Sequence, residues 1–364
     1  YTNYKNGDDS LGIAFDFCKK LNKHLGVTLM ISNCEDEIVL EPQNFKITKG
    51  NINRAQGYFS QFQLDINNFS EALPSSKSNM TFGDFFKSVD TECDIIIDLS
   101  ENTPMFIGDH KRDGYFRAST NSPNDLLEIF AKAIDMIGEF EKPIYVNYND
   151  SLCAHSRNEK TGCSKCLDVC PAGAIQTSGD VVSVDPGICG GCGFCGSVCP
   201  SGAIQTDYPS LEVILGDLSN LHDNYIKAGG KNPTLVLFDN DYGNEVINIL
   251  SRHGSGLPAN LIPYSMHSVG RVGHDILVSS IAIGYKKIFI LLNPKKIKEF
   301  DFLPKEIELA NALLSGVAKN DNNSISLIEE SDPEKIGDKL YEKDGYTKIK
   351  PSSFVAVGAP RGIL

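Results

Sequence analysis

The chain has 364 residues, of which 41% are apolar and 22% are charged, as in a folded globular protein of two or three domains. Its 34 Lys and Arg against 47 Asp and Glu give a net charge of −13, which argues against a nucleic-acid partner. No stretch reaches the roughly 18 apolar residues of a membrane span, and the start lacks a secretory leader. We therefore expect a cytoplasmic multidomain α/β protein without membrane insertion. Because Tyr1 is not Met, we expect a piece of a longer chain.

Residues 1–148 are predicted to form an N-terminal α/β or α+β domain of unknown role. In chain order, the apolar pattern predicts a helix, three strands and a second helix. These elements span residues 11–25, 27–31, 59–66, 94–99 and 126–137. The cysteines of this domain, Cys18, Cys34 and Cys93, are isolated in sequence, and we expect them to be small buried apolar residues.

Residues 209–364 alternate between helical and strand patterns, which predicts a parallel sheet covered by helices. The helices are expected at residues 211–228, 244–252, 272–283, 304–314 and 333–341. The strands are expected at residues 234–238, 260–262, 287–292 and 324–328. The segment Gly270-Arg271-Val272-Gly273-His274 falls between a strand and a helix, where it forms either a simple connecting turn or an anion site at the helix start.

Eight of the 11 cysteines lie between Cys153 and Cys199, and the second half of this block is a complete C-x2-C-x2-C-x3-C-P run. The run reads Cys189-Gly190-Gly191-Cys192-Gly193-Phe194-Cys195-Gly196-Ser197-Val198-Cys199-Pro200. Three thiolates within seven residues must surround one compact metal cluster, and the glycines let the backbone curl around it. Structural zinc uses two separated cysteine pairs, and disulfides between such close cysteines would be strained. The run therefore predicts a [4Fe-4S] cluster.

The block is also an internal repeat, because Cys170-Pro171-Ala172-Gly173-Ala174-Ile175-Gln176-Thr177 returns 29 residues later as Cys199-Pro200-Ser201-Gly202-Ala203-Ile204-Gln205-Thr206. The repeat aligns Cys163, Cys166 and Cys170 with Cys192, Cys195 and Cys199. Cys189, however, aligns with Lys160, which cannot bind iron. Cys153 is the nearest substitute, which implies an insertion in the first ligand loop.

Residues 149–208 resemble the bacterial two-cluster ferredoxin domain, in which the fourth cysteine of each run binds the other cluster. The resemblance implies two [4Fe-4S] clusters, one held by Cys153, Cys163, Cys166 and Cys199, the other by Cys189, Cys192, Cys195 and Cys170. It further implies that Ile175 and Ile204 shield the clusters from water. If the longer loop leaves Cys153 free, the first site becomes [3Fe-4S] or open to an external ligand.

Three residues of the insertion, His155, Arg157 and Lys160, are either solvated or near enough to raise the potential of the first cluster. The arrangement of the whole chain resembles a group of poorly characterised bacterial 4Fe-4S binding proteins. The C-terminal domain also resembles the delta-subunit domain of hydrogenases without its cluster cysteines, which implies a docking or scaffold role.

No nucleophile elbow, HExxH motif or P-loop occurs, so we expect an electron carrier or oxidoreductase subunit rather than a stand-alone enzyme. The expected partners are redox proteins of the formate dehydrogenase or hydrogenase type. Two alternatives stay open. One is an accessory protein whose clusters are structural or sense oxygen, and the other is an oxidoreductase with its substrate site in the α/β domains.

Overall fold

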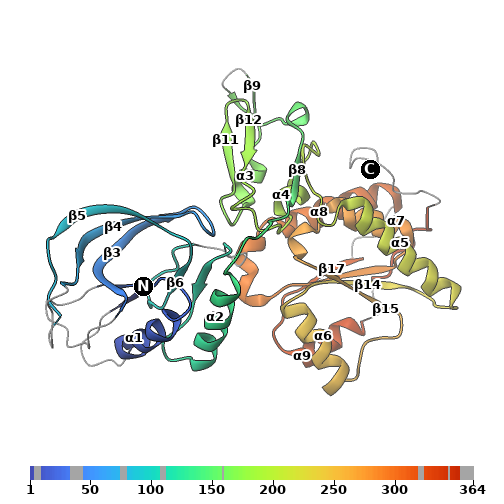
Figure 1. Ribbon diagram of the computed structural model, residues 1–364. Helices are drawn as coiled ribbons and strands as arrows, with labels where there is room; N and C mark the ends of the chain where they lie inside the picture. Colours follow the sequence, from blue (N-terminus) through green and yellow to red (C-terminus); the bar gives the residue numbers. More distant parts are fainter. Residues whose placement is uncertain are drawn as a thin grey trace. The chain divides into compact units, whose positions relative to one another are not determined.

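The computed structural model describes residues 1–3, 10–32, 44–73, 80–106, 112–157, 160–318, 324–342 and 345–352 (Figure 1). The chain divides into two compact units, Tyr1–Lys142 and Pro143–Leu364. Both contain helices and sheets, which confirms a mixed α/β protein. Among the described residues, no helix combines the length and apolar character needed to cross a membrane. Cys34 lies outside the described residues.

The first unit is built on a five-stranded mixed sheet in the order β1-β2-β3-β4-β5. Its strands are β1 (Thr2–Asn3), β2 (Thr28–Ser32), β3 (Lys46–Gln56), β4 (Phe62–Glu71) and β5 (Phe86–Cys93). Strands β1 to β3 are parallel and β3 to β5 antiparallel. A separate parallel pair joins β6 (Ile96–Asp98) to β7 (Tyr115–Arg117), and the helices are α1 (Ser10–Leu21) and α2 (Pro123–Asp135). Cys18 is buried in an apolar cluster, as predicted. Cys93 is only partly buried at the edge of another cluster, because it ends β5, the edge strand of the sheet.

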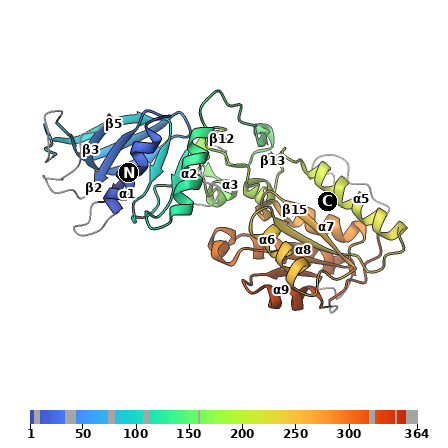
Figure 2. The same ribbon diagram turned by 60° about the horizontal axis from the view of Figure 1, so that its bottom comes forward.

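The C-terminal part of the second unit is an α/β/α sandwich around a parallel sheet in the order β15-β14-β16-β17. The strands are β14 (Thr234–Asp239), β15 (Leu261–Met266), β16 (Lys287–Leu291) and β17 (Ile325–Ile328). The helices are α5 (Leu211–Lys227), α6 (Tyr242–His253), α7 (His274–Ile283), α8 (Leu303–Ala318) and α9 (Pro333–Leu340). Helices α5, α7 and α8 cover one face of the sheet, and α6 and α9 cover the other (Figures 1 and 2). This arrangement agrees with the predicted strand and helix alternation.

The cysteine-rich block forms three two-stranded sheets and two short helices, and the helices follow the sequence repeat. Its strands are β8 (Val146–Tyr148), β11 (Ile175–Ser178), β12 (Val181–Val184) and β13 (Ile204–Thr206). The outer strands β8 and β13 pair antiparallel, as do the inner strands β11 and β12. The helices α3 (Lys165–Val169) and α4 (Phe194–Val198) each end just before the last cysteine of a run. A short turn, η1 (Asp150–Leu152), leads to Cys153, and the insertion forms a hairpin of β9 (Ser156–Arg157) and β10 (Lys160–Thr161).

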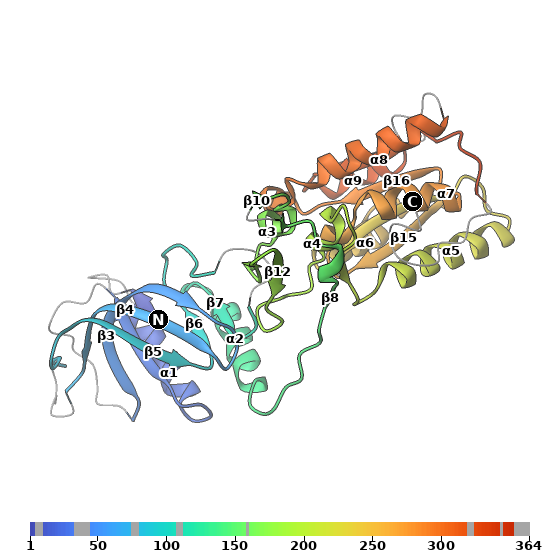
Figure 3. The same ribbon diagram turned by 90° about the horizontal axis from the view of Figure 1, so that it is seen from above.

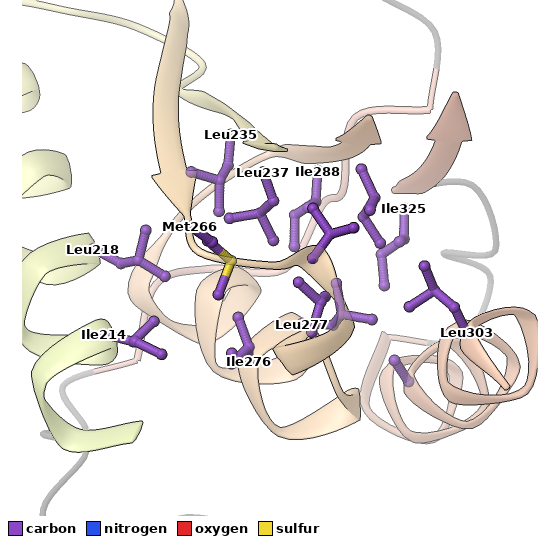
Figure 4. Close-up of a cluster of buried hydrophobic side chains, with 14 of the residues drawn as sticks. Ile214, Leu218, Leu235, Leu237, Met266, Ile276, Leu277, Ile288, Leu303 and Ile325 are labelled. Atoms are coloured by element: carbon purple, nitrogen blue, oxygen red, sulfur yellow. The ribbon is translucent and has the colours of Figure 1, made fainter. Parts of the chain in front are cut away.

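Helix α4 of the cysteine block is built into the core of the C-terminal sandwich (Figure 3). Phe194 and Val198 belong to the same buried apolar cluster as Ile214, Leu237 and Leu303, part of which is shown in Figure 4. The Phe194 ring lies 4.9 Å from that of Phe300 and 5.0 Å from that of Phe302, centroid to centroid. The block and the sandwich therefore form one compact unit, while the boundaries expected after residues 148 and 208 stay predictions.

Candidate metal centre

A cavity in the cysteine block is lined by the thiols of Cys153, Cys163, Cys166 and Cys199, and by no other cysteine. The first three precede or belong to α3, whereas Cys199 follows α4 in the second half of the repeat. Burial, followed by the charges of the neighbouring Cys199, Cys163 and Cys153, raises the pKa of Cys166 to about 11. The fold thus brings together the four cysteines that the ferredoxin resemblance assigns to one cluster.

The remaining four cysteines gather around the start of α4. Burial raises the pKa of Cys192 to about 12, with smaller contributions from Cys170 and Cys189. Burial also raises the pKa of Cys195 well above its usual range, and Cys192, Cys189, Cys170 and finally Cys166 add to the effect. Cys170 therefore lies with the second run although it ends the first, and the two thiol sets are neighbours. The assignment of these eight cysteines as iron ligands stays a prediction.

Backbone N–H groups point at Cys170 and Cys199, each of which ends one run and lies with the thiols of the other run. The N–H of Ala174 donates to Cys170 Sγ at 3.3 Å. Burial raises the pKa of Cys199, but hydrogen bonds from the Ile204 N–H and the Ser201 hydroxyl, with smaller ones from backbone N–H groups, leave it below its usual value. Gly173 and Gly202 occupy equivalent places in the repeat and have φ values of 64° and 65°. Glycine is favoured there because this left-handed turn directs the following N–H groups back at sulfur.

Two of the four glycines in the second run supply the backbone freedom expected of them. Gly191 and Gly193 have φ values of 73° and 82°, in the left-handed region. Gly190 and Gly196 do not have positive φ among the described residues. A Cβ at Gly196 would lie 3.4 Å from the backbone nitrogen of Thr206, which is an ordinary van der Waals contact between α4 and β13.

Cys153 lies beside the thiols of the first run and can replace Lys160, the residue that the repeat aligns with Cys189 and that cannot bind iron. Cys153 is half-buried and contacts the Tyr148 hydroxyl, whose pKa is raised to about 12 chiefly by burial. His155 is buried, lines the same cavity, and its Nδ1 lies 2.7 Å from the carbonyl oxygen of Cys163. Lys160 is exposed. Of the three loop residues considered for tuning the cluster, His155 therefore has the closest contact, while the Arg157 side chain lies outside the described residues.

The four cysteines of this cavity supply the sulfur ligands that a [4Fe-4S] cluster requires. Among the described residues, no three His, Cys, Asp or Glu side chains converge as the ligands of one metal ion do. Four thiols that line a cavity from different sides suit a cubane, in which each thiolate binds a different iron atom. The buried apolar residues packed with these thiols are Ile175, Val182 and Ile204. Ile175 and Ile204 thus lie where the resemblance places shielding side chains.

Alkylation should separate the cysteines of the cluster-free protein by their pKa values, because only the thiolate reacts. Modification of Cys199, whose pKa is lowered, should level off by about pH 9, near the ordinary thiol pKa of about 8.5. Modification of Cys166 should still rise about tenfold per pH unit there, because its pKa is about 11. Short iodoacetamide pulses followed by peptide mass spectrometry measure both rates. Parallel pH profiles for these two half-buried thiols would contradict the expectation.

The second run also contacts a loop of the C-terminal sandwich. This loop contains residues 270–274, for which the sequence allowed either a connecting turn or an anion site. The loop follows β15 and contains a short 3-10 helix, η2 (Val269–Arg271). Its His267 ring lies 3.3 Å from the Gly190 carbonyl oxygen, and a second cavity is lined by Cys192, His267 and Arg271 together. The loop therefore holds the cysteine block. In the sequence, Gly270 was the one residue that could have indicated this contact. A Cβ at Gly270 would lie only 1.8 Å from Cε1 of the Phe194 ring, so no larger residue fits there.

Comparison with known proteins gives a match in the centre of the chain. Residues 160–203 match the family model of the 4Fe-4S dicluster domain. The matched segment contains seven of the eight clustered cysteines and starts after Cys153. No curated protein and no solved structure matches the chain. The chain therefore contains a ferredoxin-type domain that binds 4Fe-4S clusters, which supports a role in iron-sulfur electron transfer.

Proposed function

We propose that the block binds two [4Fe-4S] clusters and passes single electrons between redox proteins. The proposed ligands are Cys153, Cys163, Cys166 and Cys199 for one cluster, and Cys189, Cys192, Cys195 and Cys170 for the other. The observation that carries the proposal is the cavity in which Cys199 joins three thiols of the first run. Such an exchange of the fourth cysteine between halves is the arrangement of two-cluster ferredoxins.

A bound [4Fe-4S] cluster supplies a centre that takes up and releases one electron. The chain's own residues set the conditions of that exchange. N–H donors near Cys170 and Cys199 stabilise negative charge on sulfur. The apolar side chains of Ile175 and Ile204 would exclude water from the clusters, and the electrostatic contact of Cys166 with Cys195 supports a short path for an electron between the two proposed sites.

The flanking parts are proposed to dock this carrier onto partners. The sandwich holds α4 by its core, which supports a scaffold role of the kind that the hydrogenase delta-subunit resemblance implies. We propose partners of the formate dehydrogenase or hydrogenase type, a relation to the poorly characterised bacterial 4Fe-4S binding proteins, and a cytoplasmic location.

Redox titration of the whole protein, purified without oxygen and followed by EPR, tests the carrier role. We expect about eight irons per chain and two reversible one-electron signals, because each cubane holds four irons and changes by one electron. A second expected result is that the protein mediates reduction of a cytochrome by a reductase. Clusters that resist reduction over the accessible range of potentials would overturn electron transfer and leave two intact clusters with a structural role.

One observation favours that second candidate, a non-catalytic accessory protein whose clusters hold the fold together. Phe194, beside Cys195, is buried in the core shared with the sandwich, so a cluster at Cys195 would also stabilise the sandwich. The two roles differ in one measurement. A structural cluster contributes to the thermal midpoint of the sandwich without reversible reduction, whereas a carrier cluster is reduced and reoxidised in repeated cycles.

A further inference from the structure

The loop after β15 carries a buried ion pair beside the second cysteine run. Arg271 Nη1 lies 3.2 Å from Asp275 Oδ2, and each side chain is only 8% exposed. Asp275 is at the start of α7, where its other carboxylate oxygen accepts the N–H of Ile276 at 2.8 Å. Neither residue takes part in the proposed binding of iron. A buried arginine and carboxylate are costly to desolvate, so their place next to the cysteine run requires a reason.

The Arg271 side chain lies directly against the backbone between two of the cysteines. A Cβ built on Gly193 would be 2.8 Å from Arg271 Cβ and 3.2 Å from its Cδ. Gly193 follows Cys192, and Cys192 and Arg271 line the same cavity. The left-handed φ of 82° at Gly193 and the absence of a side chain there let the arginine approach. The next atom after Cδ is Nε, which therefore stands close to the run.

This Nε is buried and has no hydrogen-bond partner among the described residues. A buried N–H of a charged group without an acceptor is costly, so a partner is expected. Anionic sulfur is an acceptor of the required kind, because Cys192, which lines the same cavity as Arg271, becomes a thiolate when it binds iron. Arg271 therefore combines a fixed positive charge with an unpartnered N–H donor beside Cys192 and Gly193 of the second run.

We infer that Arg271 raises the reduction potential of the cluster held by Cys170, Cys189, Cys192 and Cys195. The inference rests on the proposed function. Reduction adds one negative charge to the cluster, and a buried positive charge or N–H donor beside it favours the reduced form. Asp275 acts in the opposite direction, since its carboxylate offsets part of the arginine's charge. The C-terminal sandwich thus sets the driving force of one cluster.

Two substitutions in the full-length protein give opposite predictions. Arg271→Met should lower the ratio of reduced to oxidised second cluster at a fixed potential about tenfold, a shift of 59 mV for one electron. Asp275→Asn should raise that ratio, because the arginine is then uncompensated. Arg271→Lys keeps the charge without Nε and should lower it less than Arg271→Met. Arg252→Met, at an exposed arginine of α6, is the matched control and should leave both clusters unchanged.

Potentiometric EPR separates the two clusters, and Cys153→Ser marks the signal of the first. If Arg271→Met and Asp275→Asn shift the second signal in the same direction, or neither shifts it, the inference is wrong and the pair is only structural. If Arg271→Met loses iron, Arg271→Lys and Asp275→Asn still decide by the sign of their shifts. Clusters that cannot be reduced in the unsubstituted protein would instead overturn the proposed function, so the two failures are distinguishable.

Discussion

Replacing Cys199 by Ser is expected to damage the same cluster as replacing Cys163, although Cys199 belongs to the other half of the repeat. The converse pair is Cys170→Ser and Cys189→Ser, which should damage the second cluster. The reason is that the fold carries each last cysteine across to the opposite thiol set. Each variant should retain about four irons per chain with one unaltered EPR signal, since a cubane contains four irons.

The EPR signal that remains is compared between the two variants of each pair, so the result does not depend on how much iron a single variant loses. The residual signal of Cys199→Ser must equal that of Cys163→Ser, and the residual signal of Cys170→Ser must equal that of Cys189→Ser. Cys18→Ser, which changes a buried cysteine of the first unit, should retain both signals and serves as the control. If Cys199→Ser matched Cys189→Ser instead, each run would bind its own cluster and the exchange would be wrong.

The spacing of the second run was sufficient to predict one compact cluster, whereas the division of the eight cysteines into two sets was implied by the resemblance to two-cluster ferredoxins. The 29-residue repeat fixed the equivalence of Cys170 and Cys199, and the fold places both beside the opposite run. The displaced ligand was a harder case. Cys153 lies in the first set because the inserted β9–β10 hairpin closes on itself and leaves the preceding chain beside Cys163.

Helices and buried strands were predictable where apolar residues follow one period, as in α5 and β14. The long strands β3 and β5 were not predicted. Every residue of β5 is exposed or only partly buried, and polar residues interrupt β3, so neither shows a continuous apolar face. Their conformation depends on pairing with β4, which is a contact distant in sequence. Local periodicity carries little information about such strands.

Contacts between the block and the sandwich could not be predicted from the sequence either, because they also join residues that are distant in the chain. A short helix such as α4 has too few residues to show which apolar side chain turns toward a neighbouring domain. Phe194 was one spacer residue in the cysteine run, yet its ring meets Phe300 and Phe302 from a loop about a hundred residues away. In the sequence, Arg271 was only part of a glycine-flanked turn. The fold shows that its side chain packs against Gly193.

Phe194→Ala is expected to loosen the joint between the cysteine block and the sandwich. The ring is fully buried, and Gly270 is packed so closely under it that a Cβ would overlap its edge. Removing a buried phenylalanine ring costs about 3–5 kcal/mol, and for a unit of this size that lowers the thermal midpoint by about 10 °C. Scanning calorimetry of the intact protein under anaerobic conditions measures the transition of the second unit.

Phe140→Ala is the matched control, because Phe140 is 56% exposed and belongs to the first unit. It should leave the midpoint of the second unit unchanged. Phe194→Ala should also speed the loss of the second cluster to a chelator, since the ring no longer holds α4 and Cys195 against the core. An unchanged midpoint would mean that the sandwich does not support α4, and the scaffold role proposed for it would fail with that result. A lowered midpoint with normal cluster retention would separate the two effects and leave the sandwich as a support of the fold alone.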